Sequence, residues 1–190
     1  MSKERIYIFD TTLRDGAQTQ GVDFSIDDKL KIAKALDELG VDYIEGGWPG
    51  ANPTDTEFFQ KKLKLKNSVL TAFGMTKRSG RSADNDPGLS SILNSNTAAV
   101  CLVGKSWDFH VDVALEISNE ENLDNIAESA KLFVKEKREF MFDAEHFLMA
   151  SKIIKNMHFL ASNQHMTTVH DGLCFVIQME VLYQMKYQKL

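Results

Sequence analysis

The chain has 190 residues, 43% of them hydrophobic and 26% charged, which is ordinary for one soluble globular domain with a sizeable core. Its net charge of −5 gives no reason to expect nucleic acid or an anionic membrane as a partner, and no apolar run approaches the ~18 residues of a membrane span. Cys101 and Cys174 are too far apart for a metal-type pair, and no signal peptide precedes the first strand, so a reduced, cytoplasmic setting is expected.

Apolar segments and helical patterns alternate along the first 145 residues. Strands are predicted at 6–10, 41–45, 69–73, 98–103 and 139–143. Helical segments are predicted at 26–39, 55–65, 88–93, 111–117 and 119–135. The strand starts are about 25 to 45 residues apart, as βα units require, and polar or glycine-rich residues follow each strand. This pattern is typical of an α/β fold, either the first half of a (β/α)8 barrel or a doubly wound sheet.

The first two helices carry recognisable start and stop signals. Ser25 is the expected N-cap of the first helix, and Gly40 is its expected stop. Thr54 is the expected cap of the second helix, with Glu57 as the capping-box partner. The apolar stripe of the first helix is expected to consist of Ile26, Leu30, Ala33, Leu36 and Leu39.

The end of the first strand carries the densest group of polar residues. Residues 10–18 read DTTLRDGAQ, so an anion-binding Arg14 and a metal-type carboxylate, Asp15, follow a strand that is expected to be buried. Catalytic residues of parallel α/β folds lie at the carboxyl ends of strands. An adjacent Arg–Asp pair is also common on solvated loops, so the pair alone does not establish a site.

The stretch at residues 10–18 resembles the signature of the 2-isopropylmalate, homocitrate and citramalate synthases, which share a superfamily with the 3-hydroxy-3-methylglutaryl-CoA (HMG-CoA) lyases. Three further stretches are similar to motifs of that family and occur in its order: YIEGGWPG at 43–50, KSWDFHV at 105–111 and FDAEHF at 142–147. Together they most resemble the citramalate synthase branch. The resemblance covers residues 1–147 and implies the N-terminal part of a (β/α)8 TIM barrel.

The resemblance implies an acyltransferase that condenses acetyl-CoA with a 2-oxo acid. The citramalate branch uses pyruvate, in isoleucine biosynthesis; 2-isopropylmalate and homocitrate synthases are alternatives with other oxo acids. Such a reaction needs a divalent metal, Mg or Mn, that polarises the oxo acid, a cation for the developing oxyanion and a base for the methyl proton. The resemblance also implies a homodimer. A non-catalytic binding fragment or half-barrel is a competing hypothesis from a different class.

The same resemblance assigns the candidate site residues. Arg14 matches a catalytic, substrate-binding arginine, Asp15 the metal-binding aspartate, and Glu145 a catalytic glutamate. Gln18, Glu45 and His110 match substrate-binding positions on the rim.

Two of these residues have structural alternatives. Glu45 is equally compatible with a structural acid that binds loop amides, and His110 with a satisfied rim histidine. A basic loop, which contains Lys77, Arg78 and Arg81, is expected either to attract CoA phosphates or to be solvated surface. The family's metal site also uses two histidines in a His-x-His motif, which occurs nowhere in this chain. Metal binding by this chain is therefore expected to be weak or lost, and the chain alone is expected to be inactive.

The composition changes after residue 147. Residues 148–190 contain two of the 27 acids and five of the eight methionines. The family continues after Glu-His-Phe with FDGFKNN and later LCDTNGGTLP. With suitable synonymous codons, residues 147–152 and 173–184 encode FDGFK and LCDTNGGTLP when they are read from the third base. We therefore expect that one base was lost near the Phe147 codon, so that 1–147 is a partial synthase barrel and 148–190 an out-of-frame tail.

Overall fold

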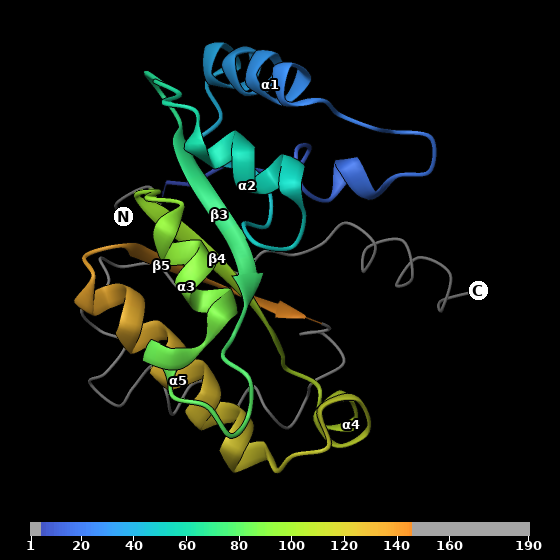
Figure 1. Cartoon of the computed structure of the whole chain (residues 1–190), viewed down its shortest axis with the longest axis vertical. Coiled ribbons are helices and arrows are strands. Elements are labelled where there is room, and N and C mark those ends of the chain that lie inside the picture. The colour runs from blue at the N-terminus through green and yellow to red at the C-terminus, as the bar shows by residue number, and fades with distance from the viewer. Residues whose placement is uncertain (1–4, 146–190) are drawn as a thin grey trace. The chain divides into compact units, whose positions relative to one another are not determined.

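The computed structural model describes residues 5–145 of the chain (Figure 1). The expected boundary at residue 147 and the expected out-of-frame tail lie outside the described residues. The strands are β1 (Phe9–Asp10), β2 (Tyr43–Glu45), β3 (Val69–Met75), β4 (Ala99–Lys105) and β5 (Glu139–Glu145). The α-helices are α1 (Ile26–Leu39), α2 (Pro53–Gln60), α3 (Pro87–Asn94), α4 (Asp108–His110) and α5 (Asn119–Lys135). Shorter turns are η1 (Gly16–Gln18), η2 (Ala83–Asn85) and the π-helical η3 (Val111–Leu115).

The strands form one sheet in the order β1-β2-β3-β4-β5. β2 pairs in parallel with β1, where Asp10 faces Ile44, and with β3, where Glu45 faces Thr71. Sequential order is that of a (β/α)8 barrel, whereas a doubly wound sheet reverses direction at its switch point. The predicted α/β fold is therefore confirmed, and the barrel rather than the doubly wound sheet is the alternative that holds.

The described residues form two compact units. The first contains the residues up to Gly74 together with Pro87–Cys101, and the second contains Met75–Asp86 together with the residues from Leu102 onward. The core of the first unit consists of Leu13, Ala33, Val41, Ile44 and Phe58. Core side chains of the second unit include Leu102, Val111, Ile126, Phe133, Phe140 and Phe142.

Helix α1 has the predicted bounds. Ser25 accepts a hydrogen bond from the Asp28 amide at 3.2 Å, and Gly40 ends the helix with a φ of 87°. The predicted stripe is wrong at its last position, because Leu39 is 76% exposed. Leu30 and Leu36 pack against the core as predicted, and the fully buried residues of the helix are Lys29, Ala33 and Asp37. Both charged residues among these have partners, which is how a helix buries charge without a large desolvation cost.

Helix α2 begins before the predicted cap and ends earlier than residue 65. Its N-cap is Asn52, whose side chain accepts a hydrogen bond from the Asp55 amide at 2.7 Å. Pro53 occupies the first helical position, where the missing N–H costs nothing. Thr54 is therefore inside the helix, and Glu57 forms an ion pair with Lys61 at 2.9 Å rather than a capping box.

The strand ends also differ from the prediction. β1 is shorter, and Ile6, Tyr7 and Ile8 are exposed, because β1 is at the edge of the described sheet and pairs only with β2. β3 runs through Gly74, where a Cβ would lie 2.2 Å from Ile92 Cδ1. A side chain at this position would displace that of Ile92, so the glycine allows the strand and α3 to pack closely.

In the second unit, α5 has its predicted bounds and begins after Ser118, which accepts from the Glu121 amide at 3.1 Å. The segment predicted as a helix at 111–117 is instead the shorter π-helical η3, Val111–Leu115, which follows directly after α4. The turn η3 ends at Glu116, with a φ of 56°. β4 and β5 each continue two residues beyond the prediction, so Lys105 and Glu145 are the last residues of their strands.

Candidate functional site

The loop after β1 is fixed by its own backbone. The amides of Arg14, Asp15 and Gly16 all donate to the Thr11 carbonyl, at 3.1, 2.9 and 3.1 Å. The Asp10 carboxylate accepts from the amide and hydroxyl of Thr12 at 3.0 and 3.1 Å. This tight turn separates two adjacent charged side chains: that of Arg14 is 10% exposed and that of Asp15 is 50% exposed.

The guanidinium of Arg14 is held by three contacts in the first unit. Its Nε donates to Glu45 Oε2 at 2.6 Å, and its Nη1 donates to Asp15 Oδ1 at 3.1 Å. Its Cζ lies 4.0 Å from the centroid of the Phe73 ring, a cation–π contact. A guanidinium has five N–H donors, so these contacts orient Arg14 and leave it donors for an anion.

Glu45 lies at the end of β2, and its side chain is 1% exposed. A buried carboxylate needs a paired cation or several hydrogen bonds, and Arg14 supplies the cation. The structure thus brings together two of the predicted site residues. Because Glu45 binds the guanidinium of Arg14 directly, the acid is part of the candidate site.

Asp15 and Gln18 lie on the same loop but outside this buried arrangement. The side chain of Gln18 is exposed, while its backbone amide donates to the Asp15 carbonyl at 2.9 Å. Within residues 5–145 there is no group of three His, Cys, Asp or Glu side chains that would hold a metal ion. Asp15 supplies one carboxylate, so the described residues do not fit a complete divalent-metal site.

Glu145 lies in the second unit, at the end of β5. Its carboxylate forms an ion pair with the Nζ of Lys105, the last residue of β4. Ser106 donates from Oγ to the Glu145 carbonyl at 2.5 Å, and Asn122 of α5 donates to the Lys105 carbonyl at 2.9 Å. These contacts therefore join the ends of β4 and β5 to α5 around the Glu145 side chain, which is 28% exposed.

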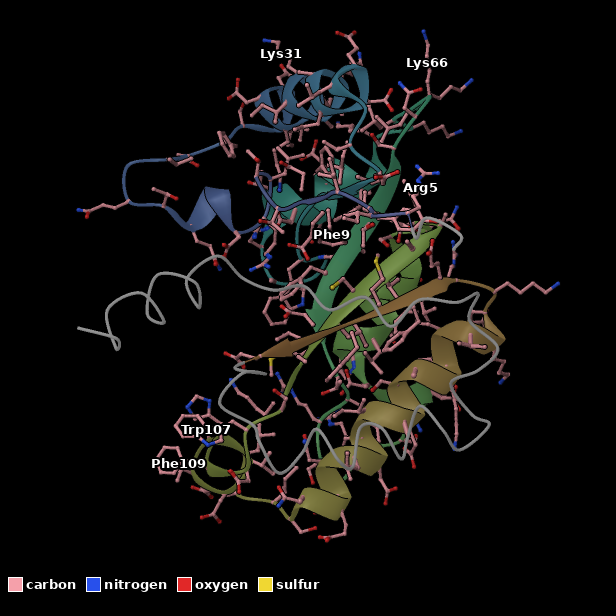
Figure 2. All side chains as sticks on the ribbon, turned by 180° about the vertical axis from the view of Figure 1, so that it is seen from behind. Arg5, Phe9, Lys31, Lys66, Trp107 and Phe109 are labelled. Carbon is pink, nitrogen blue, oxygen red and sulfur yellow. The ribbon has the colours of Figure 1, made fainter. Side chains whose placement is uncertain are left out.

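His110 lies in an aromatic group on the α4 turn. Its ring centroid is 4.7 Å from that of Trp107 and 5.9 Å from that of Phe109. Figure 2 shows Trp107 and Phe109 projecting from this turn, and Phe109 is 52% exposed. His110 is thus on the predicted loop after β4, among aromatic rings.

The basic loop after β3 is only partly solvated surface. Lys77 is buried, and its Nζ contacts Glu128 at 3.1 Å and donates to the Arg81 carbonyl at 2.8 Å. Arg78 and Arg81 are exposed. Lys77 therefore holds the loop against α5, which leaves two arginines rather than three basic residues at the surface.

Two residues of these arrangements have no predicted role in the site. The sequence places Phe73 only in a core strand, and Lys105 only in a motif. A signal for Lys105 is available, because a lysine and a glutamate that end neighbouring parallel strands meet at the same edge. Phe73 carries no comparable signal, because an aromatic residue in an apolar strand is indistinguishable from core.

Comparison with known proteins shows which family the sequence matches. The HMGL-like family matches residues 5–169. The (R)-citramalate synthases of Aquifex aeolicus and Sulfolobus acidocaldarius are 51% and 47% identical over 146 and 154 residues, which are 76% and 80% of this chain. A 2-isopropylmalate synthase of Sulfolobus acidocaldarius is 35% identical over 133 residues, or 69% of this chain and 32% of that protein. The chain spans only 28% and 29% of the length of the two citramalate synthases.

Solved structures show the same fold. The hydroxymethylglutaryl-CoA lyase of Pseudomonas aeruginosa superimposes with a TM-score of 0.58 at 16% identity, over 74% of this chain and 46% of the lyase. Among residues 5–145, no helix has the length and apolar character needed to cross a membrane. From its sequence match and its partial (β/α)8 barrel, the chain belongs to the HMGL-like family.

Proposed function

We propose that residues 1–147 are the N-terminal part of the catalytic barrel of a citramalate synthase, an acyltransferase that condenses acetyl-CoA with pyruvate. The observation that carries the proposal is the held guanidinium of Arg14, which follows β1 within the stretch that resembles the signature of the wider synthase family. The relatives with this name are 43–51% identical, whereas the 2-isopropylmalate synthases are 34–35% identical. This difference favours pyruvate over the larger oxo acids. Isoleucine biosynthesis is the pathway this product would enter.

The chemistry assigns distinct tasks to the residues. A base removes a proton from the methyl group of acetyl-CoA, and the new carbanion forms a C–C bond with the ketone carbon of pyruvate. The ketone oxygen becomes an alkoxide, and water then cleaves the thioester to release CoA. Arg14 would bind the oxo acid and stabilise the alkoxide through its remaining N–H donors. Glu45 would hold that arginine in place.

The other predicted residues take the remaining positions. Glu145, paired with Lys105, is proposed as a catalytic carboxylate that takes part in the transfer of the proton from the acetyl-CoA methyl group. Gln18 and His110 are proposed to line the substrate pocket of the complete protein. Asp15 is proposed as one ligand of a divalent metal, Mg or Mn, in the complete family site. Because a single carboxylate binds such ions weakly, this chain alone is expected to hold the metal poorly.

The proposed substrates are small molecules, and the complete enzyme is proposed to be a homodimer, as in the resembled family. A reduced, cytoplasmic location belongs to the same proposal, since the two cysteines, Cys101 and Cys174, lie far apart in the sequence and form no metal-type pair. We further propose that residues 148–190 are translated out of frame. That proposal is supported by the family motifs FDGFK and LCDTNGGTLP, which the alternative frame can encode with suitable synonymous codons.

A chimera tests the function, because the chain alone is expected to show no turnover. Residues 5–145 replace the aligned segment of the Aquifex aeolicus citramalate synthase, and CoA release is measured with pyruvate and with larger 2-oxo acids. We expect activity with pyruvate, and a loss of about 10²–10³-fold in kcat for Arg14→Ala in the chimera. A chimera that uses only a larger oxo acid would favour the 2-isopropylmalate alternative, and full activity without Arg14 would overturn its assignment.

A further inference from the structure

A buried ion pair between α1 and α2 has no part in the proposed reaction. Lys29 is 1% exposed and its Nζ contacts the carboxylate of Asp55, which is 9% exposed. The same Nζ lies 5.3 Å from the centroid of the Phe58 ring. Apolar residues of similar volume often stabilise a core as well as a buried ion pair does. Stability alone therefore gives no reason for charges at this place.

The Asp55 carboxylate is bound to the loop that follows β2. Its Oδ2 accepts from the Trp48 amide at 2.8 Å and from Asn52 Nδ2 at 3.0 Å. A Cβ on Gly47 would lie 2.5 Å from the carboxylate carbon, and Gly47 has a φ of 142°. The carboxylate thus packs directly on the loop backbone, and this close approach requires glycine. The ion pair anchors that loop to both helices.

The anchored loop leads to the guanidinium of Arg14. The Gly47 carbonyl accepts from the Phe73 amide at 3.0 Å. The rings of Trp48 and Phe73 meet edge to face, with centroids 5.5 Å apart and planes at 84°. The face of Phe73 lies 4.0 Å from Arg14 Cζ. Each contact from Lys29 to Arg14 therefore lies within the first compact unit.

We propose that Lys29 and Asp55 are positioning residues for Arg14. Asp55 fixes the Trp48 backbone, Trp48 sets the tilt of Phe73, and the ring of Phe73 supports the guanidinium. Lys29 supplies the cation that allows the Asp55 carboxylate to be buried. The functional meaning of this inference rests on the proposed binding of a 2-oxo acid by Arg14, but the structural coupling can be measured without substrate.

The test uses the full chain, labelled with ¹⁵N-arginine, in a Trp107→Phe background so that Trp48 is the single tryptophan. The Arg14 Nε–H resonance is identified by its loss in Arg14→Lys. We expect Asp55→Asn to move this resonance, to speed its exchange with water about tenfold and to shift the Trp48 emission maximum. Glu57→Gln, which removes an exposed acid from the same helix, is the matched control and is expected to change neither signal.

If a single substitution prevents folding, the double variant Lys29→Met with Asp55→Asn is used instead. It removes both charges and therefore leaves no unpaired charge in the core. A folded double variant with altered Arg14 exchange and Trp48 emission supports positioning. A folded double variant with wild-type values of both overturns it, even if the unfolding midpoint falls. Titration of the unsubstituted chain with pyruvate tests oxo-acid binding by Arg14 in this chain separately, and the chimera tests the proposed function of the complete protein. If pyruvate leaves the Arg14 resonance unmoved, oxo-acid binding by this chain fails while the positioning result stands.

Discussion

Arg14 and Glu45, 31 positions apart in the sequence, meet through one 2.6 Å hydrogen bond between Nε and Oε2, with the two side chains only 10% and 1% exposed. The pair exists because β1 and β2 are parallel neighbours whose carboxyl ends share an edge. Arg14 thereby has one fixed orientation, and Glu45 has a cation that compensates its burial.

Glu45→Ala is predicted to lower the free energy of unfolding by about 3 kcal/mol, because it leaves a nearly buried guanidinium with a weaker partner. Denaturant unfolding measures this value. The double variant Arg14→Met with Glu45→Leu is predicted to be more stable than Glu45→Ala, since neither charge remains. If the loss of unfolding free energy in the double variant equalled the sum of the losses in Arg14→Met and Glu45→Leu alone, the two residues would not be coupled.

Lys105→Met is predicted to lower kcat of the chimera about tenfold, by releasing the Glu145 carboxylate from its charge-assisted contact. Its effect on unfolding is predicted to stay below about 1 kcal/mol, because both side chains are partly exposed. Lys61→Met removes a comparable lysine from the exposed Glu57 pair and is the control. Equal activity of the two variants would exclude a role for Lys105 in placing Glu145.

Asp37 gives a prediction about pH. Its carboxylate accepts hydrogen bonds from the amides of Lys66, Asn67 and Ser68. These bonds, of which the Lys66 bond has the largest effect, lower the pKa of Asp37 below the usual 3.8, although burial acts in the opposite direction. A lowered folded-state pKa contributes stability that is present above the unfolded value of 3.8 and is lost as the pH falls through the folded value.

Asp37→Asn is therefore predicted to destabilise the chain most at neutral pH. The difference in unfolding midpoint from the unsubstituted chain should shrink as the pH is lowered below 3.8. Asp27→Asn, which changes an exposed acid on the same helix, should show no comparable narrowing. If the Asp37→Asn variant and the unsubstituted chain differed by a constant amount from neutral to acid pH, the role of the ionised carboxylate would be contradicted.

Local signals predicted helix α1 to the residue, because Ser25 and Gly40 act within one turn of the chain. They also predicted that Arg14 and Glu45 share a rim, since that follows from parallel strands. The Lys29–Asp55 pair was not predictable, because a lysine in a helical pattern indicates a solvated face until its neighbour is known. Asn52 displaced Thr54 as a cap for a similar reason: both are good caps, and Pro53 decides between them only once the helix start is fixed.

The DNA around the gene provides the last prediction. If one base was lost from a run of T near the Phe147 codon, the frame read from the third base of that codon remains open past the Leu190 codon. It is predicted to encode FDGFK, then LCDTNGGTLP, and later a His-x-His motif that supplies the two histidine partners of Asp15. Restoring the base should give a longer protein that binds a divalent metal, measured by calorimetry, and Asp15→Asn should weaken that binding. A stop codon in the alternative frame before the His-x-His motif would contradict the frameshift.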